Sequence, residues 1–274
     1  MTDGLEIATK TSDLTACIRD RVAVITLNRP QAKNAVTYPM RTALIELIAR
    51  FAEDSQVGAL LITAAGSAFC AGADVRAMDD RPAGAGIDFD QEVADLVTEQ
   101  RALTGALVAL RKPTVAALPG AAAGMGLSIA LACDIRVAAR SAILVTAFAR
   151  IALSGDYGVT WLLTRLVGFS RARELMLLSE RIDAPRAEAL GLVNRVMPDE
   201  DLQEGAFTLA CTLAEGPPMA HHLIKDNLDL ALHAGFPEAL DHEAVNLIRT
   251  MRTSDYREGV RAFLEKRKPL FEGR

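Results

Sequence analysis

Short apolar runs and longer amphipathic stretches alternate along the first 200 residues of the chain. Runs rich in β-branched residues and bounded by turn residues predict strands at 21–27, 57–63, 113–118, 134–138, 142–145 and 193–196. Apolar side chains at helical spacing predict helices at 38–54, 90–110, 124–133, 159–166 and 171–178, and a further helix beginning at 185. Because strands that alternate with helices build sheets covered by helices, we expect a mixed α/β fold.

The pattern changes after Pro198. From Asp201 onward apolar residues recur at helical spacing, and no segment predicts a strand. We therefore assign residues 1–200 to an α/β core and residues 201–274 to a helical C-terminal region. The apolar faces of these helices must be buried against a neighbouring subunit or against the core, and they include Leu202, Phe207, Leu209, Leu223, Leu228, Leu230 and Leu232.

Composition narrows the class of protein. Half of the 274 residues are hydrophobic and 24% are charged, which is typical of a globular protein with a large core. The formal net charge is −5 and the pI about 5.5, and because nucleic-acid binding needs clustered cations, we expect no nucleic-acid partner. The polar N-terminus is unlike a signal peptide, and no apolar run is long enough to span a membrane, so we expect a cytoplasmic protein.

Cysteines and histidines give no sign of a metal. The four cysteines are far apart in the sequence, and the four histidines lie in the helical region without a convincing acidic partner at i+4. This distribution predicts reduced cysteines, no disulfide framework and no metal site.

Three glycine-containing segments each follow a predicted strand: 69–74 (FCAGAD), 120–126 (GAAAGMG) and 153–158 (LSGDYG). In the second, small residues let the backbone approach a ligand closely, and the next helix directs its unpartnered first N–H groups outward. That combination is typical of an oxyanion hole, although small residues at a helix start also serve tight packing. The spacing differs from the dinucleotide fingerprint G-x-G-x-x-G, and the G-K-[ST] of a phosphate loop is absent.

Several ordered motifs resemble the enoyl-CoA hydratase/isomerase (crotonase) superfamily. They are LNRP at 27–30 with KNA at 33–35, FCAGAD, KPTVAALPGAAAGMGLSIALACDIRVA at 112–138, GDYG at 155–158, ALGLV at 189–193 and FLEKRK at 263–268. The resemblance covers about residues 20–270. It implies a spiral of ββα units with a C-terminal helical extension, and a homotrimer or hexamer in which that extension acts as a trimerisation or lid region.

The resemblance also implies roles for particular residues. The backbone N–H groups of Ala73 and Met125 form the oxyanion hole for a thioester oxygen. Lys33, Arg76 and Lys268 match cations near the phosphates of coenzyme A, although a lone surface cation is most often simply solvated. The segment beside the adenine and pantetheine is formed by Ala71, Gly72 and Asp74. Coenzyme A enters as part of the acyl-CoA substrate, so no separate cofactor is expected.

Two positions argue against ordinary hydration. A hydratase of this family activates water with two glutamates, and this chain has Ser128 and Phe148 at the matching positions. A hydroxyl is a poor base near neutral pH, and a phenyl ring is none at all.

One carboxylate remains in a suitable place. Asp156 lies in the GDYG turn, where some family members use an aspartate to move a proton in double-bond isomerisation and others use it as a dehalogenating nucleophile. Phe148, Trp161 and an acyl chain around it are expected to raise its pKa. Alternatively, Asp156 caps the helix that begins near Val159.

Four hypotheses follow. The first is proton transfer in an unsaturated acyl-CoA, with Asp156 acting between the α and γ carbons, as in fatty acid metabolism. The second is hydration of a 2-enoyl-CoA in an atypical site, with Ser128 and an ordered water replacing the glutamates. The third is an acyl-CoA-binding protein without catalysis. The fourth is RNA binding, known for an isolated relative, which the acidic pI disfavours.

Overall fold

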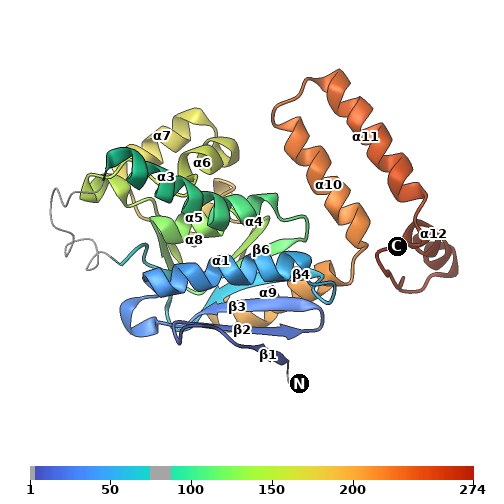
Figure 1. Ribbon diagram of the computed structural model, residues 1–274, viewed down its shortest axis with the longest axis horizontal. Helices are drawn as coiled ribbons and strands as arrows, with labels where there is room; N and C mark the ends of the chain where they lie inside the picture. Colours follow the sequence, from blue (N-terminus) through green and yellow to red (C-terminus); the bar gives the residue numbers. More distant parts are fainter. Residues whose placement is uncertain (1–3, 75–87) are drawn as a thin grey trace.

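A seven-stranded sheet forms the base of the molecule (Figure 1). The computed structural model describes residues 4–74 and 88–274, and it confirms the mixed α/β fold. The strands of this sheet follow the order β1-β2-β3-β4-β6-β8-β11. The first three pair antiparallel, and all pairs from β3 to β11 are parallel. Their bounds are β1 Leu5–Ile7, β2 Leu14–Arg19, β3 Val22–Leu27, β4 Ala59–Ala64, β6 Thr114–Leu118, β8 Ile135–Ala139 and β11 Arg195–Met197.

A second sheet has four short strands in the order β10-β9-β7-β5. Their bounds are β5 Ala68–Cys70, β7 Ala121–Ala123, β9 Ile143–Val145 and β10 Ile182–Asp183. Along the chain β4 leads to β5, β6 to β7 and β8 to β9, and helices follow each pair. The backbone therefore passes repeatedly from the large sheet to the small one and then into helices, which gives the predicted spiral of ββα units.

The helices predicted in the first 200 residues lie close to their predicted bounds, whereas no separate bounds were predicted for the helices of residues 201–274. They are α1 Tyr38–Glu53, α3 Phe89–Gln100, α4 Ala106–Ala109, α5 Met125–Leu131, α6 Val159–Val167, α7 Phe169–Leu178, α8 Ala184–Ala189, α9 Leu202–Ala214, α10 Pro218–Ala231, α11 Phe236–Met251 and α12 Ser254–Glu265. Short turns η1 Pro30–Ala32, η3 Phe148–Ile151 and η4 Asp199–Asp201 are 3₁₀ helices. The predicted helix at 90–110 is divided into α3, the π-helical turn η2 Arg101–Gly105, and α4.

The core lies where the central strands are covered on both faces. Every residue of β4 and of β6 is buried, as continuous apolar runs predict for parallel strands. Helix α1 begins at a Thr37 cap, whose hydroxyl accepts a hydrogen bond from the Met40 N–H. It buries one face at helical spacing, formed by Met40, Ala43, Leu44, Leu47, Ile48 and Phe51.

The C-terminal helices divide into two groups. Helix α9 falls within the predicted helical region, yet it packs on β3, β4, β6 and β8 through the buried Leu202, Ala206, Ala210 and Ala214. Small alanines let this helix approach the sheet closely. Helices α10, α11 and α12 instead extend away from the α/β core as an arm (Figure 1). We use the name arm for residues 218–265.

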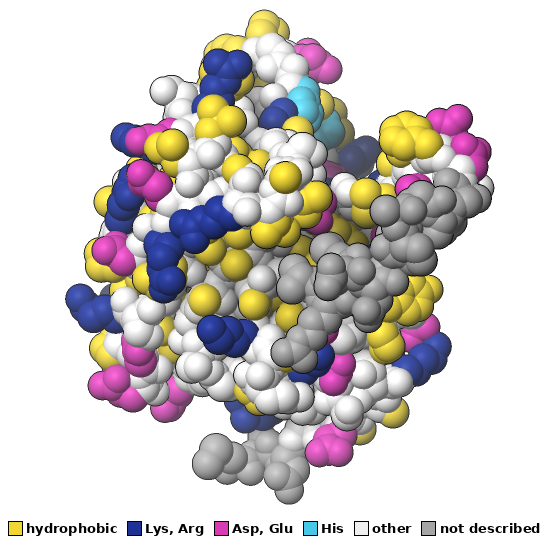
Figure 2. Space-filling model, turned by 90° about the vertical axis from the view of Figure 1, so that its left-hand side faces the viewer, with side chains coloured by type: hydrophobic (Ala, Val, Ile, Leu, Met, Phe, Trp, Pro, Cys, Tyr) yellow, Lys and Arg dark blue, Asp and Glu magenta, His cyan; other side chains and the backbone are white. Residues whose placement is uncertain are grey.

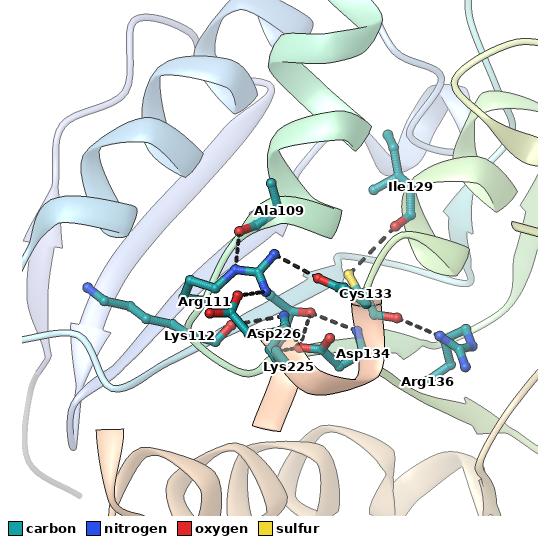
Figure 3. Close-up of polar contacts among 11 residues, drawn as sticks. Ala109, Arg111, Lys112, Ile129, Cys133, Asp134, Arg136, Lys225 and Asp226 are labelled. Carbon is teal, nitrogen blue, oxygen red and sulfur yellow. Dashed lines mark hydrogen bonds and ion pairs between the residues drawn. The ribbon is translucent and has the colours of Figure 1, made fainter. Parts of the chain in front are cut away.

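Polar contacts join the first helix of the arm to the core (Figure 3). One carboxylate oxygen of Asp134 accepts hydrogen bonds from the Thr114 N–H at 2.8 Å and the Thr114 hydroxyl at 2.9 Å, and lies 2.8 Å from Lys225 Nζ. Arg111 contacts Asp226 at 2.9 Å and Asp229 at 2.8 Å. Asp226 also lies 3.6 Å from His222 Nε2, an i,i+4 contact that was not expected from the sequence. Asp134 therefore serves the attachment of α10.

Replacing Asp134 by Ala should lower the free energy of unfolding by about 2 kcal/mol. The reason is that the half-buried Lys225 ammonium and the Thr114 N–H lose their acceptor together. Urea denaturation followed by circular dichroism measures the change. The matched control is Glu46→Ala, which removes an exposed ion pair with Lys10 and should change stability by less than about 0.5 kcal/mol. Equal effects of the two substitutions would contradict the attachment role.

Among the described residues, no helix is both long and apolar enough to cross a membrane. Within the same ranges, no group of three or more His, Cys, Asp or Glu side chains is placed to hold a metal ion. On the face drawn in Figure 2, Lys and Arg side chains lie in separate groups among hydrophobic and uncharged atoms. The coloured atoms of this one face therefore show no continuous cationic stripe of the kind that nucleic acids select.

Candidate active site

An isolated β-bridge between Val36 and Ala73 sets the direction of the Ala73 peptide N–H. The Val36 N–H donates to the Gly72 oxygen at 2.8 Å, and the Asp74 N–H donates to the Val36 oxygen at 3.1 Å. The Gly72 oxygen and the Ala73 N–H belong to one trans peptide group, so they point in opposite directions. The Ala73 N–H therefore points away from Val36, toward the loop that precedes α5.

Met125 supplies the second candidate donor because it is the first residue of α5. The first N–H groups of a helix have no intrahelical acceptor. The oxygen of the same peptide group, on Gly124, accepts a hydrogen bond from the Ser128 N–H at 3.0 Å, so the Met125 N–H points out of the helix. Gly124 reaches this position with φ of 50° and ψ of −124°, a conformation that residues with a side chain rarely adopt.

Close packing of small residues brings these two peptide groups together. Strands β5 and β7 pair in parallel, and each leads directly into one of the two loops. A Cβ atom added to Gly72 would lie 3.3 Å from the Ala123 oxygen and 3.9 Å from the Met125 nitrogen. One added to Gly126 would lie 2.5 Å from the Cβ of Cys70. Two outward N–H groups at one point are the arrangement that an oxyanion hole requires.

The half-buried Asp156 side chain lies on the turn whose main-chain oxygen contacts Ser128 of α5. Its Oδ1 atom has no hydrogen-bond partner among the described residues, and burial raises the pKa of the carboxyl to about 6. The capping alternative is not what the structure shows: α6 has Gly158 as its N-cap and no side-chain cap hydrogen bond. Asp156 accepts from the Val159 N–H through its main-chain oxygen, at 3.1 Å, which leaves the carboxyl available.

Ser128 and Phe148 adjoin the same loop. Ser128 is completely buried on α5, and its hydroxyl lies 3.3 Å from the Gly124 oxygen and 3.2 Å from the Asp156 main-chain oxygen. Phe148 is buried at the start of η3, and its ring atoms would lie 3.9 Å from a Cβ added to Gly124. Neither position brings a carboxylate to the loop.

The ring of Trp161, which was expected beside Asp156, contacts Arg165 and His233. Its indole is 38% exposed, with the Arg165 guanidinium 3.7 Å above the ring and the His233 ring centroid at 6.4 Å. The neighbours that bury the Asp156 turn include Tyr157, which is 2% exposed, and Met176, whose methyl would lie 3.1 Å from a Cβ added to Gly155.

The predicted coenzyme A residues fall into three groups. The first group is a single loop region that contains Lys33, Ala71, Gly72 and Asp74, since the Ala71 N–H donates to the Lys33 oxygen at 3.0 Å. The Lys33 side chain is exposed. Lys268 lies elsewhere, with its Nζ 2.6 Å from a Glu215 oxygen. Arg76 lies outside the described residues.

Arg29 and Asn34 are residues that the sequence analysis quoted in a motif without giving them a role. The Arg29 guanidinium contacts the Asp74 carboxylate at 2.8 Å and the Ala35 oxygen at 3.1 Å. Asn34, fully buried, donates to the Ala65 and Ala68 oxygens at 2.9 and 2.8 Å and accepts from the Arg29 N–H. Both side chains hold the loop that carries Ala73, and the LNRP…KNA motif was the signal that could have identified them.

Arg41 is a second group that sequence reasoning missed. Its guanidinium joins α1 to the Asp156 turn and to α3, since it lies 3.4 Å from the Tyr157 hydroxyl and 2.7 Å from Glu99. Burial raises the pKa of the Tyr157 hydroxyl, while the Arg41 charge acts in the opposite direction. No local pattern signals this contact, because Arg41 and Tyr157 are separated by 116 positions.

Both the sequence and the fold of this chain match known proteins. The sequence model of the enoyl-CoA hydratase/isomerase family matches residues 18–274. The 1,2-epoxyphenylacetyl-CoA isomerase of Escherichia coli K12 is 38% identical over 253 residues, which cover 92% of this chain and 95% of that protein. A probable enoyl-CoA hydratase of Rhodobacter capsulatus is 37% identical, with 94% and 96% covered. The crystal structure of an enoyl-CoA hydratase from Polaromonas sp. JS666 superimposes with a TM-score of 0.87 at 31% identity, covering 94% of this chain and 99% of that one.

Proposed function

Because the chain belongs to the enoyl-CoA hydratase/isomerase family, we propose that it moves a proton within an unsaturated acyl-CoA and so shifts the position of a double bond. Asp156 is the acid–base residue of this proposal, and the N–H groups of Ala73 and Met125 form the oxyanion hole. Coenzyme A is part of the substrate, and the reaction needs no further cofactor.

The observation that carries the proposal is the buried Oδ1 atom of Asp156, which has no hydrogen-bond partner among the described residues and belongs to a turn that contacts α5, a helix without a glutamate. A carboxyl whose pKa is raised to about 6 both takes and returns a proton near neutral pH. Two-glutamate hydration needs a second carboxylate, and Ser128 and Phe148 stand at the two matching positions. Proton transfer by one residue is therefore the chemistry that this set of side chains suits best.

The steps balance without any other reactant. A 3-enoyl-CoA binds with its thioester oxygen between the Ala73 and Met125 N–H groups, which makes the α-proton more acidic. The Asp156 carboxylate takes that proton, and the electron pair forms a dienolate whose charge rests on the thioester oxygen. Asp156 then returns the proton to the γ carbon, which gives the conjugated 2-enoyl-CoA.

Incubation with 3-enoyl-CoA and with 2-enoyl-CoA, each followed by absorbance of the conjugated enoyl thioester, tests the proposal. Absorbance should rise with the 3-enoyl substrate and stay nearly constant with crotonyl-CoA. A fall with crotonyl-CoA would show hydration and support the atypical hydratase instead. Tight acyl-CoA binding with no product from either thioester would support the non-catalytic alternative.

The pH dependence has a direction that follows from Asp156. Acting first as a base, the carboxyl must be ionised in the free enzyme, so kcat/KM should rise about tenfold per pH unit below about pH 6 and level off above it. Initial rates over about two pH units on each side of that midpoint measure the profile. A flat profile in the wild type would remove Asp156 from the role of base.

The E. coli relative suggests a second substrate class for the same residues. Its name describes the isomerisation of an epoxide of phenylacetyl-CoA. With an epoxide, the protonated Asp156 would first donate to the epoxide oxygen, so kcat/KM would fall as the pH rises through about 6. The two classes thus predict opposite pH profiles, and assays with both substrates distinguish them.

Binding of the coenzyme A portion is assigned to the loop that precedes and includes Ala73. Lys33 has an exposed side chain and follows η1, and its main-chain oxygen accepts from the Ala71 N–H. Its ammonium would suit a phosphate, and the backbone of Ala71 and Gly72 would suit a pantetheine amide. Arg76 and Lys268 remain proposed phosphate contacts, the latter after release from Glu215.

Assembly into homotrimers, paired as hexamers, is proposed for the arm. Large apolar side chains on α10, α11 and α12 stay exposed in the single chain, among them Leu228, Phe236, Leu247, Phe263 and Leu264. Apolar surface on this scale is covered in most soluble proteins. Size-exclusion chromatography with light scattering measures the number of subunits.

A further inference from the structure

One buried hydroxyl joins the two halves of the proposed site. Ser128 Oγ lies 3.3 Å from the Gly124 oxygen on one side and 3.2 Å from the Asp156 main-chain oxygen on the other. We infer that Ser128 is a positioning residue that aligns the Met125 N–H with the acid–base residue Asp156. The inference rests on the proposed function and assigns to Ser128 a role other than activation of water.

The contact with Gly124 acts on the oxyanion hole through a single peptide group. The Gly124 oxygen and the Met125 N–H are opposite ends of that group. Two donors from Ser128 meet the oxygen, the backbone N–H at 3.0 Å and the hydroxyl at 3.3 Å. Together they fix the plane of the peptide, and they draw electron density toward the oxygen, which makes the Met125 N–H a stronger donor.

The contact with Asp156 acts on the position of the carboxyl. The Asp156 turn contains three residues at positive φ, namely Gly155 at 117°, Tyr157 at 49° and Gly158 at 76°. A backbone of this kind keeps its shape only when neighbouring groups hold it. The Asp156 oxygen is held by the Val159 N–H at 3.1 Å from within the turn and by the Ser128 hydroxyl from α5. A hydroxyl has one hydrogen, so Ser128 shares it between the two oxygens.

Loss of this hydroxyl leaves the fold intact. In a Ser128→Ala protein the Gly124 oxygen keeps the N–H of residue 128, and the Asp156 oxygen keeps the Val159 N–H. Neither carbonyl becomes unsatisfied, and alanine fills nearly the same volume. The change therefore tests orientation and polarisation more than stability.

Acetoacetyl-CoA serves as the probe because its enolate absorbs in the near ultraviolet and its formation requires no turnover. The pH midpoint of enolate formation in the bound complex reports directly on the strength of the oxyanion hole. We expect Ser128→Ala to raise this midpoint by about one pH unit and to lower kcat for 3-enoyl-CoA about tenfold. The dissociation constant of the neutral ligand, measured well below the midpoint, should stay unchanged, whereas that of the enolate should rise about tenfold. The titration is repeated in an Asp156→Asn background, so that ionisation of Asp156 does not overlap it.

Two further variants separate positioning from general stability. Ser128→Thr keeps the hydroxyl and should restore the midpoint, whereas Ser128→Cys, with a weak S–H donor, should fall between wild type and alanine. Thr63→Val removes another buried hydroxyl, which donates to the Ala117 oxygen at 3.3 Å in the large sheet, and should leave both readouts unchanged.

The outcomes distinguish this inference from the proposed function. If the wild type lowers the midpoint of bound acetoacetyl-CoA relative to the free ligand, and Ser128→Ala lowers it equally, only the role of Ser128 is overturned. A wild type that does not lower the midpoint overturns the oxyanion hole and the role of Ser128 with it. Equal losses of kcat in Thr63→Val and Ser128→Ala would also overturn the positioning role of Ser128. If the alanine protein fails to fold, the midpoint of Ser128→Cys decides the question.

Discussion

Replacing Asp156 by Asn should reduce kcat for 3-enoyl-CoA isomerisation by about 10²–10⁴-fold, the range for loss of a positioned general base. The amide keeps the shape of the carboxyl but cannot take the α-proton. KM should change little, because the oxyanion hole and the coenzyme A contacts are untouched. Steady-state kinetics by conjugated-thioester absorbance measure both parameters. Full turnover by the variant would remove Asp156 from the chemistry.

Stability provides an independent check on the same variant. Burial raises the pKa of Asp156 from its usual value of 3.8 to about 6, so between these pH values the folded protein holds a proton that the unfolded chain has lost. The free energy of unfolding of the wild type therefore falls as the pH rises through this window. The Asn variant lacks this loss, so it should be more stable than wild type at pH 8 and nearly equal to it below the lower of the two values.

Denaturant unfolding at both pH values measures the difference. The matched control is Asp241→Asn, which removes the charge of an exposed aspartate on α11 and should leave activity unchanged. A variant that loses activity while gaining stability at high pH is folded, which excludes unfolding as the reason for the lost turnover. An Asn variant that is less stable than wild type at pH 8 would contradict the unpartnered carboxyl on which the proposed function depends.

The central strands and the packing helices were predictable because burial leaves a pattern in the sequence. Runs 57–63 and 113–118 are mostly apolar, with one threonine each, and the corresponding strands β4 and β6 are buried on both faces. Strand β2, which lies between β1 and β3, was not predicted, since its buried and more exposed residues alternate over only six positions. Strands β5 and β7 have only three residues each, too few for a strand pattern, and β7 consists of alanines. Helix α9 was placed outside the core because its alanines give a weak apolar signal, although they pack on the sheet.

The proposed oxyanion hole could be inferred only through a family motif. Its donors are peptide groups, and any residue except proline carries one, so Ala73 and Met125 have no distinctive side chain. Asp156 left two interpretations open in the sequence, and the structure decides against the cap because α6 begins after Gly158. The supporting contacts of Arg29 and Arg41 were not predictable, since Asp74 lies 45 positions from the first and Tyr157 lies 116 positions from the second. Contacts at such separations depend on the fold as a whole.

Gly72→Ala should lower kcat/KM for 3-enoyl-CoA about 100-fold, close to the loss of one oxyanion-hole donor. Gly72 has φ of 105°, which is strained for a residue with a Cβ, and that Cβ would lie only 3.3 Å from the Ala123 oxygen. To relieve both the backbone strain and the close contact, the Gly72–Ala73 peptide must rotate. Since the Val36 N–H holds the oxygen end of that peptide, the rotation displaces the Ala73 N–H at the other end.

The matched control is Gly168→Ala, because Gly168 also has positive φ, at 76°, but an added Cβ meets no atom within 4 Å. It lies between α6 and α7, so both substitutions strain the backbone while only one displaces a donor. Gly168→Ala should lose some stability and keep its kcat/KM. Steady-state kinetics and the bound acetoacetyl-CoA midpoint should both change in Gly72→Ala alone. Similar activity of the two variants would mean that the Ala73 N–H does not bind the thioester oxygen, and that a single donor at Met125 carries the developing charge.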